Sequence, residues 1–226
     1  MDEYRSRAGH TGKLYVHDSQ VTIRVPEEIA FETARISVAH EIGHVLIHRR
    51  GNDFDHATIR LPSSPEEEAL AEYAARLLLL PVGVFQPPLG VNLAQYAVEQ
   101  AGTAKVTVHS AVSRLGDPDI FVPGIIGAIL WRINPNIPES HPVSSRLTPQ
   151  WHLCPGHFVP VKRCKARAGS LIARVADSPS AVSLSAIETV SIGTFVGTFR
   201  VDAFGWGSIP QGTRLALAIF RNLSES

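Results

Sequence analysis

The sequence of 226 residues contains only two cysteines, Cys154 and Cys164, which is too few for a disulfide framework. Neither charge is in excess, since 21 Lys and Arg residues balance 21 Asp and Glu residues. Without a basic surface, direct binding to nucleic acid is not expected. No apolar run is long enough to cross a bilayer, and none follows the N-terminus as a secretory signal would. These absences predict a cytoplasmic protein without a membrane anchor.

Local patterns in the first part of the chain predict a β-hairpin and then a helix. Runs of β-branched and aromatic residues at 14–17 and 21–25 flank a polar turn, as in a hairpin. A helix is expected from about Thr33 to Arg50, because the segment is apolar and ends in basic residues. Gly51 would then follow directly after the helix.

The start of the next helix has an unusually complete set of signals. Ser64 is suited to the N-cap, Pro65 to the first helical position, and Glu67 to the acidic position of a capping box. The helix should end before Pro81, because proline cannot continue it. Two shorter helices are expected over 92–100 and 106–115.

The second half of the chain has a different character. A segment rich in Pro and Ser predicts a surface loop over 134–150. Strands are predicted at 125–133, 189–201 and 215–220. We therefore expect an α+β protein: a mainly helical domain with a short N-terminal hairpin over 1–117, followed by a β-rich domain over 118–226.

The first helix contains His40-Glu41-Ile42-Gly43-His44, an HExxH motif. Two histidines four residues apart project from one helical face, so both can bind one metal ion. Glu41 lies about 100° around the helix from His40, where it can take a proton from metal-bound water. Zinc suits this chemistry because it lowers the pKa of its bound water towards ~7. The motif therefore predicts Zn²⁺ bound by His40 and His44, with Glu41 as the catalytic base.

The surroundings of the motif support this interpretation. The helix is apolar nearly all round and should be buried, so two histidines beside a carboxylate need a cation. Gly43 between the histidines fits a close neighbour. His48 continues the same stripe, but it lies about 12 Å along the helix from His40, too far to share the ion. We expect His48 at the helix end or in contact with a ligand.

The third ligand is expected on the second helix. Glu66 and Glu67 are explained by the helix start, whereas Glu68 and Glu72 share a stripe with apolar residues and would face inwards. We assign Glu68 as the third ligand, and Glu72 as the acceptor that orients a ligating histidine through its other ring nitrogen. Two alternatives stay open: the roles of Glu68 and Glu72 are exchanged, or both lie on a solvated face.

At these residues the sequence resembles the ImmA/IrrE family of metallo-endopeptidases. The matching segments are 35–44, which contains the HExxH motif, and 68–81, from Glu68 to Pro81; the resemblance extends over about 14–115. It implies a gluzincin-like zinc site with Glu68 as a ligand. It also implies cleavage of an intracellular protein, often a helix-turn-helix transcriptional repressor, which relieves repression in stress responses. Some members carry a GAF-like C-terminal domain, to which 118–226 would correspond. The family usually has Asn where this chain has Glu72.

Two functions remain open from the sequence. The first is a zinc endopeptidase whose C-terminal domain regulates it or recruits its substrate. The second is a non-catalytic zinc-containing sensor or binding protein that acts on a partner by contact. Glu41 favours the first, because a structural metal site needs the two histidines but not the glutamate.

The sequence also contains candidates for an oxyanion-stabilising residue and for a second metal site. Tyr73, His56 and Arg35 are candidates for stabilising the oxyanion. A second, structural zinc site could be formed by Cys154, His157 and Cys164. The alternative is that these residues bind no metal and the cysteines are free thiols.

Overall fold

The computed structural model describes residues 2–4, 12–17, 20–50, 53–54, 64–120, 122, 124–153, 166–192, 195–207 and 214–223. The chain divides into two compact units. One consists of Met1–Gln86 with Gln100–Asp119, and the other of Pro87–Glu99 with Ile120–Ser226. The helix α3 (Leu93–Ala104) therefore contains residues of both units. The predicted assignment of a peptidase domain to 1–117 and a regulatory domain to 118–226 stays a prediction.

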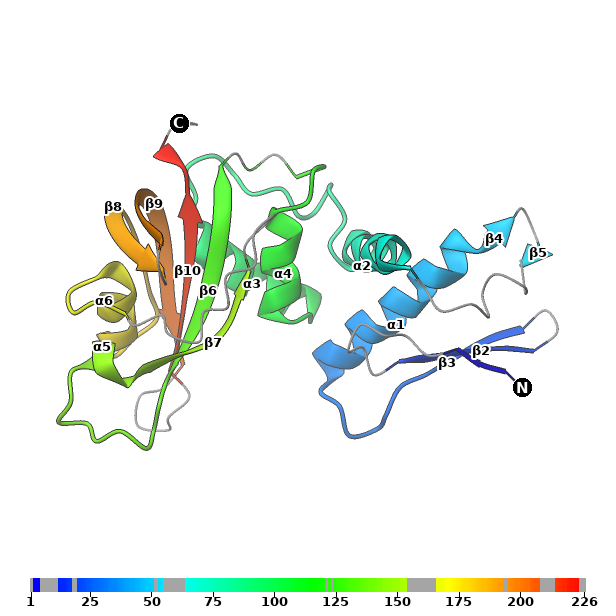
Figure 1. Ribbon diagram of the computed structural model, residues 1–226, viewed down its shortest axis with the longest axis horizontal. Coiled ribbons are helices and arrows are strands. Elements are labelled where there is room, and N and C mark those ends of the chain that lie inside the picture. The colour runs from blue at the N-terminus through cyan, green and yellow to red at the C-terminus, as the bar shows by residue number, and fades with distance from the viewer. Residues whose placement is uncertain are drawn as a thin grey trace. The chain divides into compact units, whose positions relative to one another are not determined.

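The first unit begins with an antiparallel sheet whose described strands are β1 (Asp2–Tyr4), β2 (Lys13–His17) and β3 (Gln20–Arg24), in that order. The hairpin β2–β3 was predicted from the alternating pattern and is present. Leu14 of β2 is fully buried and packs with Val16, Val21, Ile23 and Val45. Because Val45 belongs to α1 (Phe31–Ile47), this small cluster holds the hairpin against the helix (Figure 1).

The helix α1 ends three residues earlier than predicted, and the expectation that it reaches Arg50 is wrong. His48 is its C-cap residue, with its backbone N–H bonded to the carbonyl of His44. Arg49 and Arg50 instead form the short strand β4 (Arg49–Arg50), paired with β5 (Asp53–Phe54). The hydrogen bonds of this strand pair replace those of a further helical turn.

The helix α2 (Pro65–Leu79) begins as the sequence predicts. The hydroxyl of Ser64 accepts a hydrogen bond of 3.1 Å from the backbone N–H of Glu67. The helix packs against α1 and crosses it (Figure 1). A buried arginine, Arg114 of α4 (Val108–Leu115), donates to the carbonyl of Leu80 at 2.9 Å and pairs with Asp117 and Asp119. These bonds tie the end of α2 to α4.

In the second unit, five described strands form an antiparallel sheet in the order β7-β6-β10-β9-β8. Their bounds are β6 (Ile125–Ile133), β7 (Leu147–Leu153), β8 (Val182–Ile192), β9 (Phe195–Trp206) and β10 (Leu215–Arg221). The predicted strands at 125–133 and 215–220 match β6 and β10, and 189–201 falls on the hairpin β8–β9. The loop predicted over 134–150 is wrong in part, because it includes α5 (Val143–Arg146) and the start of β7. Pro149 is compatible with β7 because this strand lies at the edge of the sheet.

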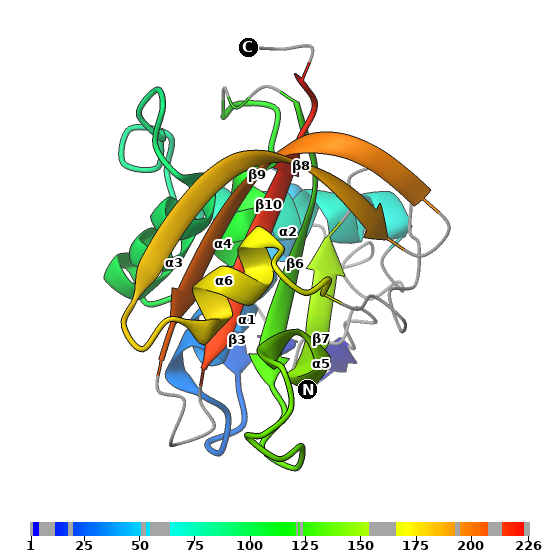
Figure 2. The same ribbon diagram turned by 90° about the vertical axis from the view of Figure 1, so that its left-hand side faces the viewer.

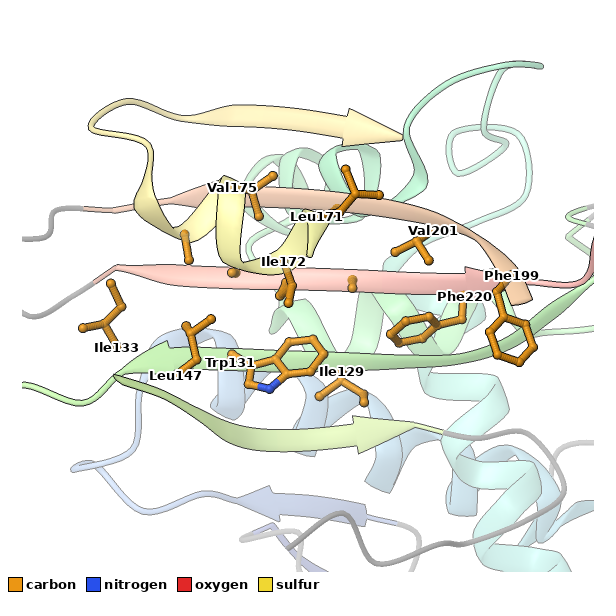
Figure 3. Packing of buried hydrophobic residues seen from close by; sticks show 14 residues of the cluster. Ile129, Trp131, Ile133, Leu147, Leu171, Ile172, Val175, Phe199, Val201 and Phe220 are labelled. Atoms are coloured by element: carbon orange, nitrogen blue, oxygen red, sulfur yellow. The ribbon is translucent and has the colours of Figure 1, made fainter. Parts of the chain in front are cut away.

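One face of this sheet is covered by the short helix α6 (Leu171–Asp177), as Figure 2 shows. Leu171, Ile172 and Val175 of α6 share one buried apolar cluster with Trp131 of β6 and Phe220 of β10 (Figure 3), as expected where a helix covers one face of a sheet. The fully buried Arg214 lies beside this cluster and donates to the carbonyl of Val175 at 2.6 Å. The chain is thus of the mixed helix and strand class that the sequence predicted. No helix in the described ranges is both long and apolar enough to cross a membrane.

Candidate metal centre

The helix α1 presents the two histidines of the motif side by side. His40 and His44 are completely buried, with relative exposures of 0%. Their Nε2 atoms lie 3.1 Å apart, and the rings meet edge to face with centroids 4.8 Å apart. The spacing of four residues on one helix therefore directs both ring nitrogens to one point.

The helix α2 brings the carboxylate of Glu68 to the same point. Oε2 of Glu68 lies 3.2 Å from Nε2 of His40, and Oε1 lies 3.6 Å from Nε2 of His44. Zinc bonds of 2.0–2.2 Å at tetrahedral angles place neighbouring ligand atoms about 3.3 Å apart. The three separations of 3.1, 3.2 and 3.6 Å are close to this value. The three residues therefore fit a zinc ion.

The close approach of α1 and α2 depends on Gly43. A Cβ atom at this position would lie 2.8 Å from the carbonyl oxygen of Ala71 and 2.9 Å from its Cα. Real Cβ atoms essentially never show such distances to backbone atoms. Gly43 therefore lets the two backbones touch, and this contact brings the carboxylates of α2 within reach of the histidines of α1.

Glu41 lies beside the ligand cluster and is also completely buried. The buried backbone of Gly12, directly before β2, packs against its side chain. A Cβ atom at position 12 would lie 3.0 Å from Cγ of Glu41 and 3.1 Å from Oε1. The N-terminal sheet thus supports the carboxylate that the sequence indicates as a base.

A second carboxylate of α2, that of Glu67, contacts the site in a way the sequence did not predict. Its Oε1 atom lies 2.8 Å from Nδ1 of His44 and 2.8 Å from Nε2 of His48. Burial alone would raise the pKa of this carboxyl, but the hydrogen bonds with His48 and His44 outweigh it and hold the pKa below its usual value. The capping box accounted only for the backbone of Glu67. The signal that could have revealed the contact is the spacing of four residues between His44 and His48.

Glu72 was predicted to orient a ligating histidine, and at Nδ1 of His44 the structure places Glu67 instead. The side chain of Glu72 is 46% exposed, and its Oε2 lies 3.8 Å from Nη1 of Arg76, one turn further along α2. Glu72 lies one turn beyond Glu68 on α2, and its partly exposed side chain lines the pocket beside His40. A role for Glu72 towards His40 stays a prediction.

A small pocket opens beside His40. Glu72 and Arg76 of α2 line it from one side, and residues of α1 and α4 complete it: Ile36, His109, Ser110 and Ser113. The pocket therefore places both apolar and polar side chains beside one candidate ligand.

The other named candidates are placed as follows. The hydroxyl of Tyr73 donates to Asp119, and the guanidinium of Arg35 lies 5.8 Å from the ring centre of Phe31. His56 lies outside the described residues, as do Cys154, His157 and Cys164.

An HExxH helix joined by a glutamate from the following helix is typical of metallopeptidases. Residues 5–101 match the model of the peptidase M78 family, described as an IrrE N-terminal-like domain. This match confirms the predicted resemblance to the ImmA/IrrE family over residues 5–101. The family implies a metal ion and suggests protease activity.

No curated protein matches the chain. Among solved structures, a transcriptional regulator from Mycobacterium tuberculosis is similar, with 12% identity and a TM-score of 0.46. The match covers 97% of this chain and 64% of that one, so the chain spans less than two thirds of the regulator's length.

Proposed function

We propose that the chain is a zinc-dependent endopeptidase that cleaves a protein. The observation that carries this proposal is the convergence of three ligand atoms at 3.1–3.6 Å beside a buried glutamate. His40, His44 and Glu68 would hold the zinc ion, and Glu41 would act as the base. Glu68 and Glu41 place two carboxylates beside two imidazoles in a buried site, and such a site needs a cation.

The roles of the residues follow from their positions. A zinc ion held by His40, His44 and Glu68 would supply Lewis-acid chemistry to the site. Glu41 would take a proton from the attacking water and pass a proton to the leaving amine. Gly12 holds the carboxylate of Glu41 in place, and the pocket beside His40 would receive a side chain of the substrate.

The substrate is proposed from the family resemblance. It would be an intracellular protein, with a helix-turn-helix transcriptional repressor as the first candidate. The β-rich region over 118–226 would regulate the peptidase or recruit the substrate. Counted along the chain, the five described strands of its sheet lie in the order second, first, fifth, fourth, third, which is compatible with a GAF-like sensor domain.

The alternative is a zinc-containing sensor or binding protein without catalysis. The observation in its favour is that His40, Glu41 and His44 are all completely buried. A peptidase must admit a peptide to these buried side chains, whereas a non-catalytic site need not.

Metal content and cleavage together test the proposal. Purified wild type, Glu41→Gln and Glu68→Ala would be analysed for bound zinc, and each would be incubated with a library of cellular peptides read out by mass spectrometry. We expect wild type to bind one zinc and to generate new termini. Glu41→Gln should keep the zinc and lose cleavage, and Glu68→Ala should lose both.

The control is Glu66→Ala, which removes an exposed carboxylate from the same helical turn. This variant should behave as wild type. Cleavage by Glu41→Gln at the wild-type rate would refute the mechanism. A zinc-loaded wild type that cleaves nothing would favour the non-catalytic alternative.

A further inference from the structure

Glu67 joins two histidines of α1 through a single oxygen atom. Its Oε1 lies 2.8 Å from Nδ1 of His44 and 2.8 Å from Nε2 of His48. His44 is fully buried, and the side chains of His48 and Glu67 are 11% and 18% exposed. Three side chains thus form a hydrogen-bonded chain that leads from the end of α1 to a candidate zinc ligand.

This arrangement determines which nitrogen of His44 carries the proton. An ionised carboxylate only accepts hydrogen bonds, so Nδ1 of His44 must be the donor. In a neutral imidazole the lone pair then lies on Nε2. Nε2 is the atom that faces His40 and Glu68, at 3.1 and 3.6 Å. Glu67 therefore selects the tautomer of His44 that can bind a metal and holds the ring in that orientation.

His48 has the corresponding effect on Glu67. Its Nε2 donates to the same Oε1 atom, and its backbone is held at the helix end by the bond from its N–H to the carbonyl of His44. Without this donor, the partly exposed Glu67 would gain rotamer freedom and spend less time on His44.

A second metal ion is a poorer explanation of this group. His44, His48 and Glu67 also have ligand-type atoms within 4.8 Å of one another. However, their separations of 2.8 Å are those of hydrogen bonds, whereas ligands of one zinc ion lie about 3.3 Å apart. The distances among His40, His44 and Glu68 are those expected around a zinc ion. The distances from Glu67 to His44 and His48 are those of hydrogen bonds.

We propose that Glu67 and His48 are positioning residues: Glu67 orients His44 for zinc, and His48 acts through Glu67. The inference rests on the zinc site of the proposed function but not on peptidase activity. It assigns to Glu67 the orienting role that was predicted for Glu72.

Zinc affinity of the full chain, measured by competition with a fluorescent chelator, tests the proposal without any substrate. Glu67→Ala should weaken zinc binding roughly 10–100-fold, the effect typical of losing a partner of a metal-bound histidine. Glu66→Ala, the adjacent exposed acid, should leave it unchanged. Glu67→Gln should weaken binding less than Glu67→Ala, because its amide oxygen can still accept both N–H groups.

His48→Ala should weaken binding by a smaller factor in the wild-type background and should have no further effect in Glu67→Ala. An equal loss from His48→Ala in both backgrounds would show that His48 does not act through Glu67. Equal affinities for Glu67→Ala and Glu66→Ala would overturn the inference as a whole.

Circular dichroism of the metal-free proteins verifies folding. If Glu67→Ala does not fold, Glu67→Gln and His48→Ala decide instead: unchanged zinc affinity in both overturns the inference. A wild type that binds no zinc overturns this inference and the proposed function together. The expected loss of affinity in a protein that cleaves nothing supports this inference and removes only the peptidase assignment.

Discussion

Replacing Gly43 by alanine tests whether the contact between α1 and α2 builds the metal centre. In an ordinary helix this change stabilises by about 1 kcal/mol, because alanine has the higher helix propensity. Here the new Cβ would lie 2.8 Å from the carbonyl oxygen of Ala71 and 2.9 Å from its Cα, both of them backbone atoms. A side chain could turn away from the methyl group, but the backbone of α2 can only move as a helix.

The size of the effect follows from these distances. Ordinary contacts begin at 3.4 Å, so α2 must move by about half an ångström. Overpacking of this kind costs about 1–3 kcal/mol, which cancels or exceeds the gain in propensity. Zinc sites tolerate about 0.2 Å in ligand distance, so the movement also separates Glu68 from His40 and His44. We expect the free energy of unfolding to fall by about 1 kcal/mol and zinc affinity to fall at least tenfold.

Gly102→Ala is the matched control, because Gly102 lies in α3 and a Cβ atom there would meet nothing within 4 Å. Urea unfolding of the metal-free proteins should show Gly102→Ala at or above wild-type stability and Gly43→Ala below it. Zinc competition should show a loss in Gly43→Ala alone. If Gly43→Ala is stabilised as much as Gly102→Ala and binds zinc normally, the helix contact does not set the ligand geometry.

Two further variants test the supports of the site. Gly12→Ala would place a methyl group 3.0 Å from Cγ of Glu41 and displace its carboxylate. We expect the cleavage rate to fall about tenfold, because small displacements of a reacting group are costly. The zinc affinity should be unchanged. Gly83→Ala, where a Cβ would meet nothing within 4 Å, is the control, and equal cleavage rates in the two variants would contradict the placement of Glu41. Ser64→Ala removes the acceptor for the N–H of Glu67 and should lower the free energy of unfolding by about 1 kcal/mol in urea. A stability equal to wild type would show that this cap contributes nothing.

The local features of the first unit could be predicted from sequence because they depend on residues a few positions apart. The hairpin β2–β3 follows from alternation, and the start of α2 at Ser64 follows from the chemistry of an N-cap. The convergence of His40 and His44 follows from helical spacing alone.

Predictions failed where a pairing partner decided the conformation. Arg49 and Arg50 are compatible with a last helical turn, but they pair with β5 instead. The Pro-rich segment that contains Pro149 suggested a loop, yet it pairs with β6 at the sheet edge, where a missing N–H is tolerated. Secondary-structure propensity is a local property and does not indicate which strand a segment will pair with.

The sequence by itself determined that one helix carries two histidines and a glutamate on the faces that a metal centre requires. Only the tertiary structure decided which carboxylates of α2 meet them. Glu67, Glu68 and Glu72 are all acidic residues within two turns of α2, and sequence assigned Glu67 to the helix cap and Glu72 to a histidine. The packing of α1 on α2 at Gly43 brings Glu68 to both Nε2 atoms and Glu67 to His44 and His48, and leaves Glu72 beside Arg76. The angular position of a side chain around a helix can be read from sequence, whereas the line along which two helices touch depends on the whole fold.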